Sequence, residues 1–408
     1  MGESGEGLMS VSVHNPDQYM AALRTIIAQG RKRIGILIGA GAPAGMSKAD
    51  GTYPLIPAVV GLTELVLTAI EPEYGKQIDA LKSELPQHDI ETILSRVRTL
   101  AKVIGKSKVH ELDAEGFEKL GERICTEIGK VVDARLPRGS AYANLVSWIT
   151  GTSRDHPVEI FTTNYDLLLE EAFEAVRAPY FDGFVGGREP FFDPVSIANG
   201  DLPARWTRLW KLHGSLGWCK GELEDVIRSG KSSATHLIFP EHLKYDQTQK
   251  APYAALFDRL KIFLSSHDTL LISIGFSFAD AHVAARIDEG LASNPLASVF
   301  AFQFKPLADE KGACDLARRL PNFSVYARDK AVINGIPGPW VLPADLPSKD
   351  WGPIRSSYWG QPNQSEPQQF LLGAVEPFCR FFASSRSSQV SAATIASLTG
   401  PVPAAVAI

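Results

Sequence analysis

Four short segments of small or polar residues each follow an apolar run in this sequence. The first contains Gly39, Ala40, Gly41, Ala42, Pro43 and Gly45, directly after the apolar residues 34–38. Small residues at such a turn let backbone amides approach a pyrophosphate group. A tight turn between a strand and a helix, with no ligand, would use the same residues.

The second and third segments carry side chains that could do acid–base or positioning chemistry. Residues 161–166 supply Thr163, Asn164 and Asp166, directly before a helical pattern. Within residues 209–216, a mainly apolar run is followed by His213, Gly214 and Ser215. Asn164 or Asp166 could instead cap the next helix, and a histidine at a strand end is often purely structural. We keep both interpretations open at this point.

The fourth segment is the turn Gly275, Phe276 and Ser277, which follows the apolar residues 269–274. A strand-to-helix turn capped by Ser277 or Asp280 would look the same. Open α/β sheets bind ligands at the carboxyl ends of their strands. Four such ends in one chain therefore predict a single ligand site at one edge of a sheet.

The elements expected around these segments alternate between strand and helix. We expect further strands at 158–162, 207–212, 236–239 and 298–304, with helices at 165–176, 253–265, 279–292 and 309–319. The pattern predicts an α/β fold with a Rossmann-like, mostly parallel sheet. Residues from about 58 to 149 have helical periodicity and are expected to form an inserted helical module. A dehydrogenase would instead place there a second strand that ends in an acidic ribose ligand.

The domain organisation follows from a change in composition. Residues 1–330 are expected to form the binding domain, and residues 331–408 a Pro- and Trp-rich arm and tail. Eight prolines and three tryptophans between 335 and 377 exclude a mainly helical segment. They predict an irregular arm that packs on its own domain or on another subunit. The Ser- and Ala-rich tail is expected to be disordered or to order on assembly.

Charge and cysteine spacing exclude several kinds of partner. The net charge of −5 provides no overall basic field, so we expect no direct binding of nucleic acid. The longest apolar runs are too short for a membrane span, which predicts a soluble, cytoplasmic protein. Four cysteines without a CxxC pair and nine scattered histidines predict no metal site. A Walker A motif is also missing from the sequence.

The four segments together resemble those of sirtuins. Sirtuins have a Gly-Ala-Gly turn, a Thr-Gln-Asn-Ile-Asp strand end, a His-Gly-Ser segment and a Gly-Thr-Ser turn, and the resemblance covers roughly residues 30–305. It implies NAD as the ligand, with Gly39, Ala40 and Gly41 at the diphosphate and Gly275 and Ser277 at the adenosine half. Asn164 and Asp166 would lie near the nicotinamide ribose and carboxamide, and His213 would be the general base. Thr163 stands where the family has Gln.

Two departures from the deacylating sirtuins favour water as the acceptor. The cysteine spacing cannot build their zinc ribbon, and residues 54–58 lack the Asp-Phe-Arg of their Gly-Ile-Pro-Asp-Phe-Arg stretch. The pattern resembles the zinc-free, defence-associated sirtuins of bacteria. That resemblance implies an NAD hydrolase in antiphage defence by NAD depletion, a homo-oligomer and a HerA-type ATPase as partner. The alternatives are an NAD-dependent protein deacylase or ADP-ribosyltransferase, and a non-catalytic NAD or ADP-ribose sensor and scaffold.

Overall fold

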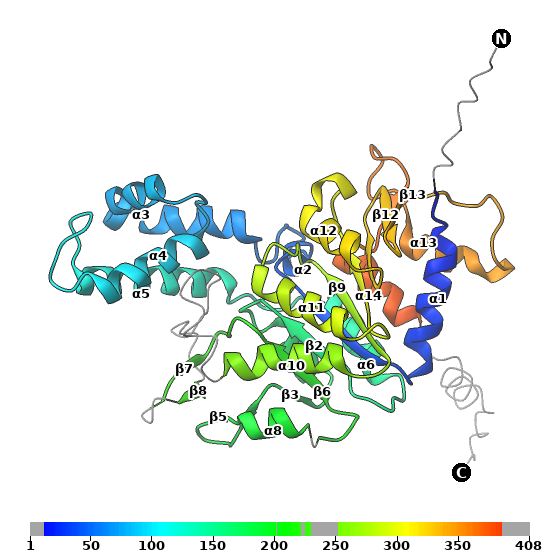
Figure 1. Cartoon of the computed structure of the whole chain (residues 1–408), viewed down its shortest axis with the longest axis horizontal. Helices are drawn as coiled ribbons and strands as arrows, with labels where there is room; N and C mark the ends of the chain where they lie inside the picture. Colours follow the sequence, from blue (N-terminus) through cyan, green and yellow to red (C-terminus); the bar gives the residue numbers. More distant parts are fainter. Residues whose placement is uncertain (1–11, 201, 222–224, 230–251, 386–408) are drawn as a thin grey trace, which may run out of the picture.

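The centre of the molecule is a nine-stranded sheet with the order β13-β12-β11-β10-β9-β1-β2-β6-β3 (Figure 1). The computed structural model describes residues 12–200, 202–221, 225–229 and 252–385. The strand expected at 236–239 and the tail beyond residue 385 lie outside these residues. The sheet strands are β1 (Arg33–Ile38), β2 (Glu159–Thr162), β3 (Tyr180–Phe181), β6 (Thr207–Lys211), β9 (Thr269–Ile274), β10 (Ser298–Phe302), β11 (Phe323–Tyr326), β12 (Lys330–Ile333) and β13 (Ile336–Pro339).

The strand order confirms the predicted Rossmann-like class. Strands β11, β10, β9, β1, β2, β6 and β3 are parallel, and only β12 and β13 pair antiparallel. On one side of β1 lie β2, β6 and the edge strand β3, and on the other side the chain runs outward from β9 through β10 to β11. The order therefore reverses between β1 and β9, and such a switch point opens a crevice at the carboxyl ends of the strands.

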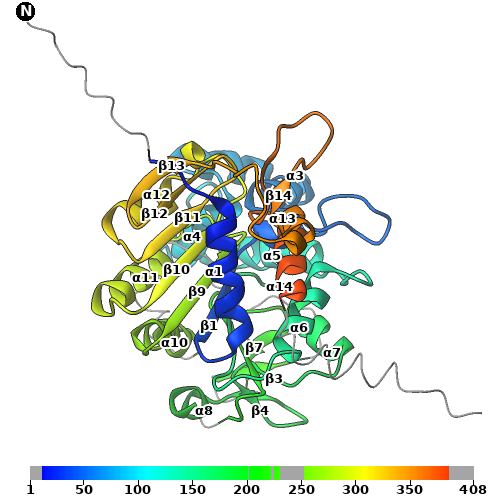
Figure 2. The same ribbon diagram turned by 90° about the vertical axis from the view of Figure 1, so that its right-hand side faces the viewer.

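Helices cover both faces of the sheet (Figure 2). One face carries α1 (Pro16–Gln29), α6 (Ala141–Thr150), α7 (Leu168–Ala175) and α14 (Val375–Ser384), and the other carries α10 (Tyr253–Ser265), α11 (Ala281–Ser293) and α12 (Lys311–Arg319). Within β1, Ile36 and Ile38 belong to the first core and Leu37 to the second, because successive side chains of a strand point to opposite faces. Helix α1 begins after Asn15, whose side chain caps the helix by accepting from the N–H of Asp17.

The predicted helical insertion projects from the α/β body (Figure 1). It contains α3 (Val59–Glu84), α4 (Ile90–Val103) and α5 (Ala114–Val132), while α6 returns to the sheet. We call residues 59–132 the helical module. Asp89 caps α4 by accepting from the N–H of Thr92, and the apolar side of α4 is buried as its periodicity predicted. No β-strand interrupts the described chain between β1 and β2, in agreement with the missing dehydrogenase-type strand.

A second, small sheet lies between β2 and α10 in the sequence and was not predicted. Its strands are β4 (Phe184–Val185), β5 (Phe191–Phe192), β7 (Trp218–Lys220) and β8 (Val226–Arg228), joined in the order β4-β5-β8-β7. The short helix α8 (Pro194–Asn199) interrupts it in the sequence. Strands of two or three residues are too short to show an alternating pattern, so the sequence carries no usable signal for them.

The carboxyl-terminal arm packs on its own chain. Residues 330–339, at the predicted junction between domain and arm, form the hairpin β12–β13 of the main sheet. Its turn is Asn334-Gly335, both with positive φ, as a two-residue hairpin favours. The arm then forms α13 (Gly352–Tyr358), β14 (Trp359–Gly360), β15 (Gln369–Phe370) and α14. Phe378, Phe381 and Phe382 of α14 are fully buried, so the arm is part of the first core.

Three shorter helical segments complete the described elements. These are α2 (Gly41–Ala44), η1 (Leu307–Asp309) and η2 (Lys349–Trp351). Within the described ranges, none of the helices is both long and apolar enough to cross a membrane.

Candidate functional site

The turns after β1 and β9 are packed against each other at the switch point. The N–H of Gly39 donates to the carbonyl of Ile274 at 3.1 Å, and that of Gly41 donates to the carbonyl of Gly275 at 2.9 Å. A Cβ on Gly39 would lie 2.4 Å from the Gly275 oxygen, and a Cβ on Gly275 would lie 2.3 Å from the Ala42 nitrogen. Gly275 also has a φ of +66°. Glycine is thus required here for close backbone packing.

This packing bears on the role expected for the first turn. The amides of Gly39 and Gly41 are bonded to carbonyls of the β9 end, and the diphosphate contact expected for these residues stays a prediction. The Ala40 N–H has no hydrogen-bond acceptor among the described residues. Ala42 and Pro43 are buried, and Gly45 is exposed with its Cα facing Val375 of α14. Within this turn, the Ala40 N–H is therefore the backbone amide that a ligand could approach.

Asn164 follows β2 and reaches across to the first turn. Its Nδ2 donates to the carbonyl of Gly39 at 3.2 Å, and its own N–H donates to Oγ1 of Thr162 at 3.1 Å. The N–H of Thr163 donates to the carbonyl of Ile38, which continues the β1–β2 pairing. The side chain of Asn164 is buried, and its Oδ1 has no partner among the described residues. A buried amide oxygen without a partner is costly, and a ligand donor would satisfy it.

Asp166 lies in a separate buried cluster on the α7 side of the sheet. Its Oδ1 accepts from the N–H of Leu168, which forms an Asx-type turn just before α7, whose N-cap residue is Leu167. Its carbonyl accepts from Nζ of Lys211, which also donates to Glu170 at 3.0 Å. Burial raises the pKa of Asp166 to about 6, although the positive charge of Lys211 opposes this shift. Asp166 is thus not the N-cap residue of α7, although its carboxylate holds the turn that leads into this helix.

His213 follows β6 and pairs with a carboxylate from the other half of the sheet. Its Nε2 lies 2.8 Å from Oδ2 of Asp280, and both side chains are buried. The other oxygen of Asp280 accepts from the backbone N–H of His282 and Val283 and so caps α11. Asp280 was expected only as a cap, and the tertiary structure adds its contact with His213, which is an ion pair only when the imidazole is protonated. The contact joins the loop after β6 to the start of α11.

The remaining predicted residues surround this pair. Gly214 has a φ of +86° and turns the chain after β6. Ser215 is buried, and its Oγ lies 3.5 Å from the carbonyl of Tyr165. Phe276 is buried against Phe278, while Ser277 is exposed and accepts from the N–H of Ala279. Ser277 is therefore the residue of this turn that solvent or a ligand can reach.

Sequence reasoning missed a contact from the helical module. The hydroxyl of Tyr165 donates to Oε1 of Glu91, at the start of α4, at 3.2 Å. The Tyr165 ring also lies 6.5 Å from the His213 ring, centroid to centroid. Burial raises the pKa of Glu91 to about 7, and the charge of His213 opposes the shift. Nothing in the sequence signalled this role, because charged residues on amphipathic helices normally face solvent.

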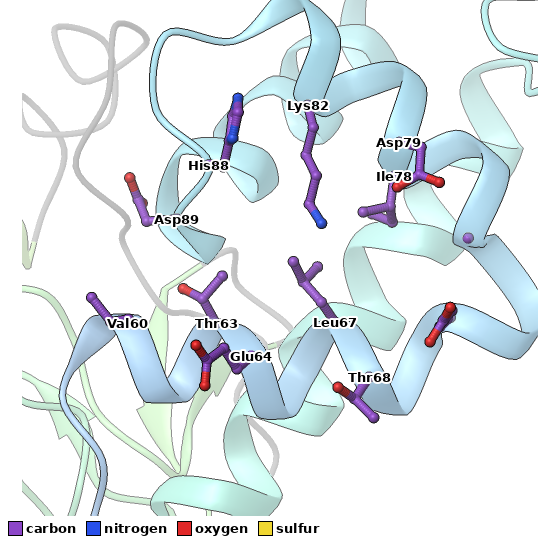
Figure 3. A pocket seen from close by; sticks show the side chains of 12 residues that line it. Val60, Thr63, Glu64, Leu67, Thr68, Ile78, Asp79, Lys82, His88 and Asp89 are labelled. Carbon is purple, nitrogen blue, oxygen red and sulfur yellow. The ribbon is translucent and has the colours of Figure 1, made fainter.

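A groove of about 570 Å³ lies within the helical module (Figure 3). Its walls come from residues along most of α3 and from the loop before α4, and the Lys82 side chain points across it toward Leu67. None of the predicted site residues lines it. In the described ranges, no cluster of three His, Cys, Asp or Glu side chains is arranged to hold a metal ion.

Comparisons with known proteins match one part of the chain to a family. Residues 158–320 match the model of the SIR2-like domain. This region contains Asn164, Asp166, His213 and Gly275, but not the turn after β1. A solved structure described as "Structural Basis for the Mechanism and Regulation of Sir2 Enzymes" is 14% identical, covers 72% of this chain and 89% of its own, and has a TM-score of 0.34. No curated protein matches the sequence.

Proposed function

We propose that this protein binds NAD at the carboxyl edge of its sheet and hydrolyses the bond between nicotinamide and ribose. The observation that carries the proposal is the meeting of four strand ends at the switch point. The glycine turns of β1 and β9 pack together there, and Asn164 and His213 follow the neighbouring strands β2 and β6. The SIR2-like match over residues 158–320 supports NAD as the ligand.

The residues at this edge suit a dinucleotide. The crevice at a switch point is where open α/β sheets bind such ligands. The close-packed glycine backbones leave the Ala40 N–H available to a phosphate oxygen. The buried Oδ1 of Asn164 can accept a hydrogen bond from a ribose hydroxyl or from the carboxamide of nicotinamide.

The reaction requires orientation and a proton acceptor. The bond between the nicotinamide nitrogen and the ribose carbon breaks, and its electron pair leaves with neutral nicotinamide. The ribose carbon then has oxocarbenium character, as in glycoside hydrolysis. A water oxygen bonds to this carbon and releases one proton. His213 is the basic side chain at this edge, and the Asp280 carboxylate would stabilise the imidazolium that forms.

Water is the proposed acceptor because the sequence departs from the deacylating pattern. The four cysteines are too far apart to build a zinc ribbon of the usual spacing, and the Asp-Phe-Arg stretch is missing after the first turn. The motifs resemble those of zinc-free, defence-associated sirtuins instead. A peptide acceptor would make the protein a deacylase or an ADP-ribosyltransferase.

Chromatography of the products tests the proposal. The full chain is mixed with NAD, with and without an acetyl-lysine peptide, and nicotinamide and ADP-ribose are quantified. Equal amounts of both products without peptide are expected. Release of nicotinamide only with the peptide would establish the transferase or deacylase alternative. Binding of NAD in calorimetry without any turnover would establish the sensor.

The resemblance to defence-associated sirtuins also supports a proposal for the role of the protein in the cell. We propose that the protein acts as a homo-oligomer, works with a HerA-type ATPase and depletes NAD during phage infection. Light scattering of the full chain measures its oligomeric state, and co-purification with a HerA-type ATPase tests the partner. NAD concentrations in infected bacteria should fall with the wild-type protein and stay constant with Asn164→Ala. An equal fall with both proteins would contradict the defence role.

A further inference from the structure

Glu91 links the helical module to the candidate catalytic edge. It stands in the first turn of α4, whose buried residues Ile90, Ile93 and Leu94 anchor that end of the helix in the core. Its carboxylate accepts a hydrogen bond from the Tyr165 hydroxyl at 3.2 Å. The start of α4 is therefore fixed relative to the loop that carries Asn164.

A continuous series of contacts leads from Glu91 to α11. The ring of Tyr165 is tilted by 33° against the ring of His213, with 6.5 Å between their centroids. His213 in turn pairs with Asp280 at 2.8 Å. Tyr165, His213 and Asp280 come from three different elements, and the side chains of Tyr165 and His213 are buried. Charges interact strongly in such surroundings because little water screens them.

Electrostatic effects couple the same groups. Burial raises the pKa of Glu91 to about 7. The charge of His213 and the hydrogen bond from Tyr165 oppose this shift, whereas the charges of Asp89 and Asp280 reinforce it. Arg98, further along α4, acts on the Tyr165 hydroxyl in the opposite sense to Glu91. The charged and titratable groups that act on Glu91 or on its partner Tyr165 are therefore Asp89 just before α4, Arg98 within α4, His213 after β6 and Asp280 at α11.

We propose that Glu91 is a positioning residue of the active site, which acts through Tyr165 and through its own charge on His213. The helical module is then part of the catalytic apparatus, because it supplies a carboxylate that stabilises the protonated imidazole. The effect on turnover rests on the NAD hydrolysis proposed above. The electrostatic coupling between Glu91 and His213 does not depend on it.

NMR of the full chain labelled with ¹³C at the glutamate carboxyl carbon tests the coupling without NAD. One signal should titrate near pH 7 and disappear in Glu91→Gln. In His213→Gln its midpoint should move to higher pH by about half a unit or more, since the opposing charge is lost. Tyr165→Phe should move the Glu91 midpoint in the same direction, because it removes the hydrogen bond that lowers this pKa. This variant replaces His213→Gln in the test if His213→Gln does not fold. Glu118→Gln, which removes an exposed carboxylate of α5, should leave the signal unchanged.

Kinetics then test the positioning role. Glu91→Gln should lower kcat for nicotinamide release by about tenfold or more, leave KM within about twofold and remove an inflection near pH 7 from the pH profile. Glu118→Gln should behave as the wild type. An unchanged Glu91 midpoint in both His213→Gln and Tyr165→Phe, or an unchanged kcat in Glu91→Gln, would overturn the proposal. A wild-type protein that releases no nicotinamide would defeat the proposed function, while the NMR result would still decide the coupling.

Discussion

His213 and Asp166, two residues expected to share one reaction, lie in different electrostatic environments. The charged neighbours of His213 are Asp280 and Glu91, whereas those of Asp166 are Lys211 and Glu170. Asn164 lies two residues before Asp166 in the sequence and carries a buried oxygen without a partner among the described residues. At the scale of single residues, Asn164 and His213 are thus the side chains best placed to meet a ligand.

Replacing Asn164 tests this placement. Asn164→Ala should lower nicotinamide release by about 100-fold or more, because the variant lacks the amide that would orient the ribose. Loss of the 3.2 Å hydrogen bond to Gly39 should cost only about 1 kcal/mol of stability. Product chromatography and urea unfolding measure the two effects. The exposed Asn199 gives a matched control, Asn199→Ala, and wild-type turnover by Asn164→Ala would refute the assignment.

The raised pKa of Asp166 predicts a pH dependence of stability. Because the folded protein holds this proton up to about pH 6, while the unfolded chain releases it near pH 4, ionisation destabilises the fold as the pH rises through this window. Asp166→Asn keeps an acceptor for the N–H of Leu168 but cannot ionise. Relative to the wild type, the variant should gain on the order of 2 kcal/mol between pH 4 and pH 7. Urea unfolding at pH 4 and pH 7 measures this change in the free energy of unfolding. If the wild type instead became more stable relative to the variant as the pH rises, the attraction of Lys211 would outweigh the burial of the carboxylate.

The junction of the β1 and β9 turns is the feature that matters most at the scale of elements. It joins the two halves of the doubly wound sheet where the strand order reverses, and it leaves no room for a Cβ atom at Gly39 or Gly275. A ligand at this edge would contact both turns. The stability of the sheet and the affinity for NAD should therefore depend on the same glycines.

Gly275→Ala should lower both the stability of the sheet and the affinity for NAD. The new Cβ would meet the Ala42 nitrogen at 2.3 Å, and the φ of +66° is strained for alanine. We expect a loss of about 2–4 kcal/mol in the free energy of unfolding and weaker NAD binding. Gly187→Ala is the control, because a Cβ there meets no atom within 4 Å. Equal unfolding midpoints for the two variants would contradict the role given to the junction.

The arm is an element of the fold, and this limits how assembly can be tested. Deletion of residues 335–408 would remove β13 and the buried Phe378, Phe381 and Phe382. Loss of such side chains typically costs several kcal/mol each, so the shortened chain is expected to unfold. Light scattering of the full chain is therefore the informative measurement of oligomeric state.

At the scale of the whole molecule, segments from opposite ends of the chain are tied together. Arg355 of α13 pairs with Asp17 of α1 through two contacts, one of them 3.1 Å between Nε and Oδ1. The Tyr358 hydroxyl donates to the same carboxylate, and Asp17 is only 1% exposed. The arm thereby connects α1 to α14 across one face of the sheet, as Figure 2 shows.

Removal of Arg355 should destabilise the whole fold. Arg355→Ala leaves the Asp17 carboxylate buried with less compensation, which typically costs about 3–5 kcal/mol. Arg318→Ala, at a side chain that is 71% exposed, should change the free energy of unfolding by less than about 0.5 kcal/mol. Thermal and urea unfolding compare the two variants, and equal stabilities would exclude a structural role for the Arg355–Asp17 pair.

The sequence by itself determined the local features of this protein. Periodicity located β1, β9, α10 and the inserted helices, because the burial of a strand or a helix face is repeated along the chain. Asn334-Gly335 is a typical hairpin turn, but the prolines after it led us to expect an irregular arm, and the hairpin was not predicted. The strand ends with Asn164, His213 and Gly275 were found because small and polar residues follow apolar runs there.

Only the tertiary structure decided which of these residues meet. The pairing of His213 with Asp280, the contact of Glu91 with Tyr165 and the separate cluster around Asp166 all join residues that are distant in sequence or that point to different sides of the sheet. The short strands β4, β5, β7 and β8 depend on the same long-range contacts. Strand order and helix docking set these distances, and neither leaves a periodic signal in the chain.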